Sequence, residues 1–179
     1  MKTNNIVIFS TLITSLLLQT KVIAADGELN FIGTLVESSC TISESSKSIN
    51  VVMGSIGADR FQTSEYSNLE PFTITLENCV GNGSIKAHAI FSGADGGDGN
   101  PVDNILDVVG GAAGVGIEFF DGANSNSVLP LLVESAGVTL PTVQGNVILN
   151  FSVAYKKLGS DPVTPGRANG FANFELTYF

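Results

Sequence analysis

Histidine and cysteine are scarce in this sequence: it contains one histidine, His88, and two cysteines, Cys40 and Cys79. A zinc site needs more His or Cys ligands than these residues supply. A catalytic triad could form only around His88, and no nucleophile-elbow motif accompanies it. We therefore expect a protein that is not an enzyme and holds no metal or cofactor. We expect His88 itself to lie at the surface or rim of a strand.

Basic residues are also few. Eight Lys and Arg residues stand against seventeen Asp and Glu residues, which gives a formal net charge of −9. The basic residues are scattered, and such an acidic surface repels nucleic acid and anionic lipid. We expect no nucleic-acid partner and attribute the charge to solubility.

No apolar run is long enough to span a bilayer, which takes about 20 residues. The longest, Ile6 to Leu18, has 13 residues, follows Lys2 and precedes the small residue Ala24. This pattern indicates a secretory signal peptide over residues 1–24, with a short membrane anchor as the alternative. Cleavage after Ala24 leaves 155 residues, a length that suits one domain.

The two cysteines are most simply paired with each other, because an even number of cysteines in an exported chain favours a disulfide. A Cys40–Cys79 bond would close a loop of 39 residues, worth about 4 kcal/mol on the chain-entropy model. Two free thiols, or half of a metal site, are the alternatives.

Helical periodicity is missing, whereas short alternating segments separated by turn residues recur along the chain. In 146–157, Val147, Leu149, Phe151, Val153 and Tyr155 share one side. This pattern predicts an all-β sandwich with 54–68 and 158–169 as loops, and Asn-Gly at 82–83 predicts a hairpin. The other expected strands are 49–53, 72–77, 85–91, 105–109, 115–120, 128–133 (an edge strand, because it contains a proline) and 170–179.

A Gly-rich loop over 92–102 contains or borders three acidic residues, Asp95, Asp98 and Asp103. Three carboxylates so close together raise the possibility of a calcium site. Their spacing does not fit the calcium-loop pattern, so we interpret the segment as a solvated loop.

The stretch from Leu29 to Ile42 has 14 residues, about twice the length of an ordinary strand. Leu29, Phe31, Gly33 and Leu35 fall on one side of it, because side chains in a strand alternate. We predict that this first half does not pair within its own domain but completes another molecule. The alternative is an ordinary first strand of its own sandwich.

Four segments together resemble the pilin subunits of the chaperone–usher class, as found in type 1 fimbriae. They are FIGTLVESSC at 31–40, FTITLENC at 72–79, GVGIE at 114–118 and NFELTYF at 173–179, with tyrosine next to last. The resemblance covers essentially the whole chain after the signal peptide.

The resemblance implies an incomplete immunoglobulin-like sandwich that lacks its last strand, G. Residues 25–36 would be an N-terminal donor-strand extension and 37–179 the pilin domain. The partners implied are a periplasmic chaperone, an outer-membrane usher and neighbouring pilin subunits, with export through the periplasm to a fimbrium on the cell surface. The implied chaperone- and donor-binding residues of the final strand are Phe174, Leu176, Tyr178 and Phe179.

Within this class the sequence favours a structural subunit that polymerises by donor-strand exchange. The alternative is a tip or minor adhesive subunit that binds a host ligand directly. Two-domain adhesins of this class carry an extra N-terminal domain, whereas here Cys40 follows only 15 residues after the expected cleavage site.

Overall fold

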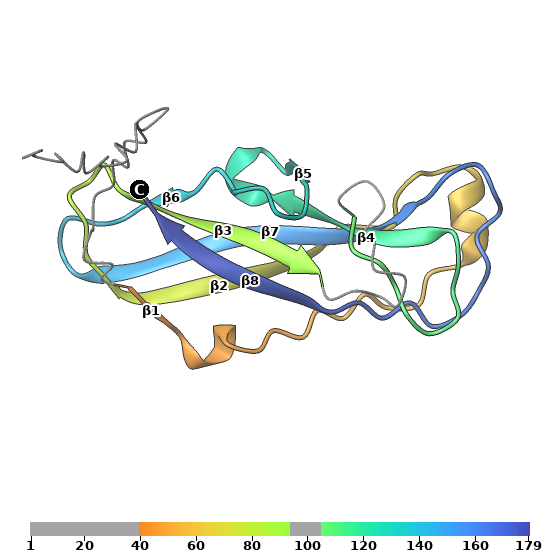
Figure 1. Ribbon diagram of the computed structural model, residues 1–179, viewed down its shortest axis with the longest axis horizontal. Helices are drawn as coiled ribbons and strands as arrows, with labels where there is room; N and C mark the ends of the chain where they lie inside the picture. Colours follow the sequence, from red (N-terminus) through yellow and green to blue (C-terminus); the bar gives the residue numbers. More distant parts are fainter. Residues whose placement is uncertain (1–39, 94–104) are drawn as a thin grey trace, which may run out of the picture. The chain divides into compact units, whose positions relative to one another are not determined.

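The computed structural model describes residues 40–93 and 105–179, and these residues form strands with short 3-10 helices (Figure 1). No helix in this part of the chain is long and apolar enough to cross a membrane. The 3-10 helices are η1 (Glu44–Ser46), η2 (Ala58–Gln62) and η4 (Gly122–Asn124). The strands are β1 (Thr41–Ile42), β2 (Glu70–Cys79), β3 (Lys86–Gly93), β4 (Val115–Asp121), β5 (Ser127–Leu129), β6 (Val138–Thr139), β7 (Gly145–Lys157) and β8 (Ala172–Tyr178).

The strands form two antiparallel sheets. The first has the order β1-β2-β7-β4-β5 and the second the order β6-β3-β8. The long strand β7 lies at the centre of the first sheet, between β2 and β4. The expected all-β sandwich is therefore confirmed, and β5 is an edge strand as its neighbouring proline predicts.

The core lies between the sheets and follows the predicted alternation. Ile74 and Leu76 of β2 and Leu149 of β7 are almost completely buried. Phe91 of β3 stacks on Phe119 of β4 with ring centroids 4.6 Å apart, which joins the two sheets. Each large apolar side chain buried in this way contributes about 1.5–3 kcal/mol.

The disulfide between Cys40 and Cys79 is present and links the start of β1 to the end of β2. The two strands are adjacent in register, with Ile42 opposite Leu76. The segment 54–68, expected as a loop, contains the short 3-10 helix η2.

The hairpin prediction at Asn82-Gly83 is wrong. Gly83 does adopt a positive φ of 81°, and the Asn82 side chain accepts hydrogen bonds from the backbone N–H groups of Ser84 and Ile85. However, β2 and β3 belong to different sheets, so the turn carries the chain from one layer to the other. A local turn signal does not specify which strands pair.

Three expected strands are shorter than predicted or absent. Residues 49–53 form no strand, and 105–109 makes only isolated bridges, Leu106 with Ile117 and Val109 with Asn169. The strand expected over 128–133 ends at Leu129, because Pro130 has no N–H to continue the ladder.

Candidate functional site: the unpaired edge of the last strand

The last strand, β8, pairs along one side only. Its partner there is β3, from Ala87 opposite Tyr178 to Gly93 opposite Ala172. Within 40–93 and 105–179, no strand pairs with its other side, since β8 ends the order of the second sheet. A long edge with unsatisfied N–H and C=O groups is a template for pairing with another chain.

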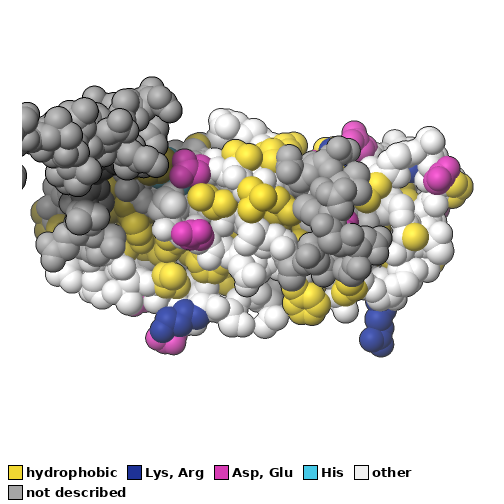
Figure 2. All heavy atoms as spheres, viewed as in Figure 1, with side chains coloured by type: hydrophobic (Ala, Val, Ile, Leu, Met, Phe, Trp, Pro, Cys, Tyr) yellow, Lys and Arg dark blue, Asp and Glu magenta, His cyan; other side chains and the backbone are white. Residues whose placement is uncertain are grey.

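The side chains of β8 alternate as the sequence predicts. Phe174, Leu176 and Tyr178 are half-buried and pack against the core, whereas Glu175 is exposed. Figure 2 shows hydrophobic side chains gathered on this face of the molecule, over β3 and β8, with few charged side chains among them. The edge therefore offers apolar contacts as well as backbone hydrogen-bonding groups.

A second row of half-buried apolar side chains lies on the segment 49–53. Ile49, Val51 and Met53 pack against the core, while Asn50 and Val52 are exposed. The segment alternates as a strand does, yet it joins neither sheet. Its apolar residues thus meet the core without the backbone pairing that normally accompanies such a pattern.

An open pocket of about 470 Å³ lies just before β8, between residues 54–58 and 163–169. Phe61, Val115 and Tyr155 contribute apolar surface to it. The Tyr155 hydroxyl donates a hydrogen bond to the Ala168 carbonyl at 2.6 Å, which holds one wall in place. Burial raises the pKa of Tyr155 above its usual value.

The other end of β8 is held by Phe179 and His88. The Phe179 ring stacks on the imidazole with centroids 4.2 Å apart. His88 is only 7% exposed, so its expected position at the surface or rim is wrong. Its Nδ1 lies 2.7 Å from the Ser135 carbonyl oxygen, and a side chain at Gly137 would meet the ring. The segment carrying Ser135 covers His88, and β-strand alternation alone does not reveal such a cover.

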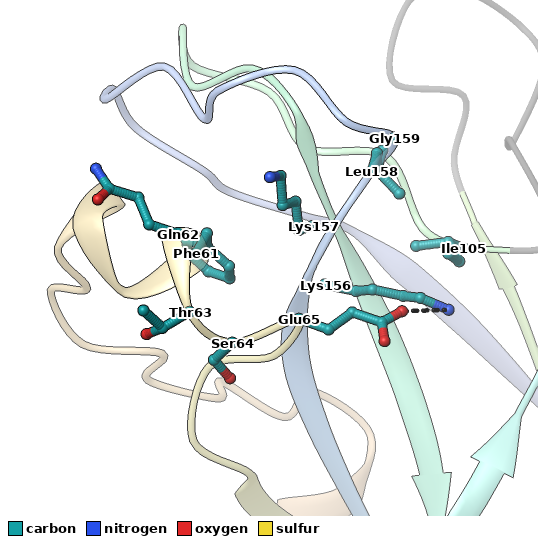
Figure 3. Close-up of a pocket in the computed structure, with 10 residues that line it drawn as sticks. All are labelled: Phe61, Gln62, Thr63, Ser64, Glu65, Ile105, Lys156, Lys157, Leu158 and Gly159. Atoms are coloured by element: carbon teal, nitrogen blue, oxygen red, sulfur yellow. Dashed lines mark ion pairs between the residues drawn. The ribbon is translucent and has the colours of Figure 1, made fainter.

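A different pocket, of about 500 Å³, lies beside η2 and the end of β7 (Figure 3). Glu65 and Lys156 point toward each other there, with 3.7 Å between Oε1 and Nζ. Lys156 also binds the buried Glu118 carboxylate at 2.9 Å. The described residues contain no group of three or more side chains suited to hold a metal ion. The charge of Lys156 thus binds β7 to β4 through Glu118 and to the loop before β2 through Glu65.

Lys156→Met is expected to lower the free energy of unfolding by about 2 kcal/mol, because it leaves the Glu118 carboxylate without its partner. Glu118 is 5% exposed, and its Oε2 already lacks a hydrogen-bond partner. The hydrogen bond with Glu118 raises the pKa of Lys156. The stabilisation is therefore complete below the usual lysine pKa of 10.5 and is lost as the pH rises through the raised value.

Urea unfolding at neutral pH measures this effect. Glu118→Gln combined with Lys156→Met removes both charges and should recover part of the loss. Equal stability of Lys156→Met and the unaltered protein would contradict the assignment.

The structure brings some of the predicted site residues together. Cys40 and Cys79 are bonded, and the residues expected on the final strand share one face of β8 and continue into Phe179. The expected donor residues, Leu29, Phe31, Gly33 and Leu35, lie outside the described residues, as do the acidic residues at 95, 98 and 103. The pocket before β8 was not predicted, because its walls come from loops far apart in sequence.

A sandwich whose last strand has a free apolar edge defines an immunoglobulin-like fold that is incomplete, the fold of chaperone–usher pilins. Two solved structures share it at 23% identity: a chaperone–usher pilus subunit (TM-score 0.64, covering 89% of this chain and 99% of that one) and the P pilus rod subunit PapA (TM-score 0.60, covering 79% and 100%).

The sequence comparisons name the family. Residues 29–179 match the fimbrial protein family, and the chain belongs to it. It is 33% identical over 156 residues to the "Probable major fimbrial subunit LpfA" of Escherichia coli O157:H7, covering 87% of this chain and 85% of that one. It is 32% identical to the "Type-1 fimbrial protein, A chain" of Salmonella typhi, covering 89% and 86%. The protein is therefore a fimbrial subunit and not an enzyme.

Proposed function

We propose that this chain is a structural subunit of a surface fimbria that polymerises by donor-strand exchange and so contributes to adhesion. The free edge of β8, with its half-buried apolar side chains, carries the proposal. Addition of a strand to a sheet edge is an established mode of recognition, and the donor-strand complementation of pilins is a standard instance of it.

The proposed donor is the N-terminal extension, residues 25–36, of the next copy. Its apolar face runs over seven residues, Leu29 to Leu35, and β8 also has seven residues. A donor in the place of a last immunoglobulin strand lies antiparallel to β8, so Leu35 would lie near the start of β8 and Leu29 near its end. Leu35 would then reach the pocket between 54–58 and 163–169.

The remaining donor residues fit the same arrangement. Leu29 and Phe31 would cover the half-buried face of β8, and Gly33 would allow close approach of the two backbones because it has no side chain. A shift of one residue would turn all the apolar side chains away from the groove, so the alternation fixes the register. The contact is head-to-tail and does not close, so repetition makes a filament.

The same edge would serve the periplasmic chaperone before assembly. We propose that residues 1–24 direct export and that the chaperone then covers Phe174, Leu176 and Tyr178 and binds the terminal carboxylate at Phe179. At the outer-membrane usher, the extension of the next subunit replaces the chaperone. Residues 37–179 would form the pilin domain that ends at the cell surface as part of the fimbrium.

Phe31→Asp tests the proposed facing. It would bury a charge in the neighbouring subunit, which costs several kcal/mol, whereas Asn30→Asp places the same charge on the outer face. We expect Phe31→Asp to reduce fibre yield by at least about ten-fold, because a ten-fold change needs only about 1.4 kcal/mol. We expect Asn30→Asp to leave the fibre yield nearly unchanged. Leu29→Asp should behave as Phe31→Asp does.

Surface fibres are counted by electron microscopy and by recovery of sheared fimbriae. Equal yields from Phe31→Asp and Asn30→Asp would contradict the assigned facing, because the two residues lie next to each other in sequence and differ in the side they present.

A further inference from the structure

Arg167 lies in the wall of the pocket before β8 and is exposed. Its loop is firmly held: the Arg167 N–H donates to the Gly110 carbonyl at 3.1 Å, and its own carbonyl accepts from the Ala112 N–H at 3.0 Å. The loop approaches 111–112 so closely that a side chain at Gly166 would overlap the backbone there. The position of the arginine backbone at the pocket is therefore well defined.

The guanidinium has no carboxylate partner within the described part of its own chain. The ion pairs among residues 40–93 and 105–179 all involve Lys47 or Lys156. Arginine presents a planar array of donors suited to a carboxylate, so an exposed and unpaired arginine at the mouth of a binding pocket can select for an acidic ligand.

An acidic residue directly follows the donor segment, at a suitable distance from Leu35. Glu37 follows Leu35 by two residues, so in an extended chain both lie on the same side and about 7 Å apart. The chain that follows Leu35 must stay close to the pocket, because only a few residues separate Leu35 from the disulfide-bonded Cys40. Cys40, which is bonded to Cys79 in the body of the donor subunit, follows Leu35 by five residues, which span at most about 17 Å.

We propose that Arg167 is a selectivity residue of the donor-strand site and pairs with the Glu37 carboxylate of the incoming copy. The inference rests on the proposed function, because it assumes that Leu35 of the donor lies in the pocket. It adds a charge criterion to a contact that is otherwise apolar. Arg167 would also supply a positive charge at the contact between two copies, each of which carries many more acidic than basic residues.

The size of the effect follows from the exposure of the pair. Ion pairs in contact with solvent are weak and are screened by salt, so we expect selectivity of a few-fold and not an all-or-none requirement. The apolar side chains of the donor supply the affinity, and Arg167 distinguishes between donors that are equally apolar. Charge complementarity of this kind gives specificity more than affinity.

A competition between two peptides tests the pairing. The full mature subunit is refolded with an excess of two synthetic peptides in equal amounts: the native peptide, residues 26–39 of this sequence, and the reversed peptide, which is the same but for Glu37→Arg. Mass spectrometry of the intact complexes gives the ratio of the two bound peptides. The extension of the subunit itself competes with both peptides equally and leaves this ratio unchanged.

The ratio of bound native peptide to bound reversed peptide should fall by about five-fold when the subunit carries Arg167→Glu. The matched control is Lys86→Glu, which makes the same change of charge on β3 beside the other end of β8 and should leave the ratio nearly unchanged. In about 0.5 M NaCl, where the Debye length is about 4 Å, the difference between Arg167→Glu and the unaltered subunit should largely vanish.

Equal ratios for the unaltered subunit and Arg167→Glu would overturn the pairing while leaving donor-strand exchange intact, because both peptides would still bind. An equal shift with Lys86→Glu would also overturn it, since the effect would then come from net charge alone. Failure of the subunit to bind either peptide would refute the donor assignment itself, and the Arg167 inference with it.

Discussion

A subunit that lacks residues 26–36 should form no fibres while still binding the proposed periplasmic chaperone. The deletion removes the proposed donor face, Leu29 to Leu35, but leaves β8 and the pocket before it unchanged. Growth of a head-to-tail filament requires that each subunit both donate and accept, and this variant could only accept. Electron microscopy of surface fibres and co-purification with the chaperone measure the two activities separately.

Mixing supplies an internal control for this result. Because each incoming subunit must donate its extension into the groove of the last one, a subunit that accepts but cannot donate cannot extend a fibre and can occupy only its first position. In a mixture with the unaltered subunit, a folded deletion variant should therefore be found in fibres at the first position alone, whereas a misfolded variant would be absent from them. Fibres of normal number and length from the deletion variant alone would refute the donor assignment.

The strands that could be predicted from sequence are those whose pattern is decided by burial on one face. In β7 the side chains of Val147, Leu149 and Phe151 alternate with exposed ones, and all three lie in the core. The same holds for Ile74 and Leu76 of β2. Because the two faces of a half-buried strand meet different surroundings, the period of two is strong and local.

Features that depend on distant segments could not be predicted in the same way. At Asn82-Gly83 only the glycine adopts a positive φ, whereas a two-residue hairpin turn needs it at both positions, and the flanking strands enter different sheets. His88 is buried because the segment containing Ser135 lies over it. The Lys156–Glu118 pair joins residues that are 38 apart in sequence. Spacing along the chain gives no sign of such contacts.

The segment 49–53 shows the most informative difference. Its alternation is that of a strand, and Ile49, Val51 and Met53 do pack on the core, yet it belongs to neither sheet in the described structure. The pattern and the missing ladder are compatible if the segment lines a groove that another chain fills. On that proposal, the prediction failed because it assumed that every strand finds its partner within one polypeptide.

Replacement of both cysteines by serine should lower the free energy of unfolding by about 4 kcal/mol. The disulfide closes a loop of 39 residues, and its loss restores to the unfolded chain the conformational freedom that the loop removes. Cys79 is fully buried, so a serine there also places a hydroxyl among apolar neighbours. The local effect should be large as well, because β1 has only two residues to hold it against β2.

This loss is large in relation to the total free energy of unfolding expected for this fold. A complete domain of ordinary size is stable by only about 5–15 kcal/mol, and a sandwich that lacks a strand buries less apolar surface than a complete one. We therefore expect the Cys40→Ser, Cys79→Ser variant to be recovered from the periplasm in much lower yield. Urea unfolding of the subunit complemented with the peptide of residues 26–39 gives the change in stability directly.

Two comparisons separate the contributions to this loss. Alanine at both positions removes the bond without burying hydroxyl groups, so it should recover the part of the loss that comes from the buried serine hydroxyl in Cys79→Ser. The unaltered subunit measured in reductant lacks only the covalent link, whereas the alanine variant also lacks the buried sulfur of Cys79, so the difference between the two measures the packing of that sulfur. If the serine variant and the alanine variant both have the urea midpoint of the oxidised subunit, the bond contributes nothing to stability. Strand β1 is then held by its pairing with Leu76 and Glu77.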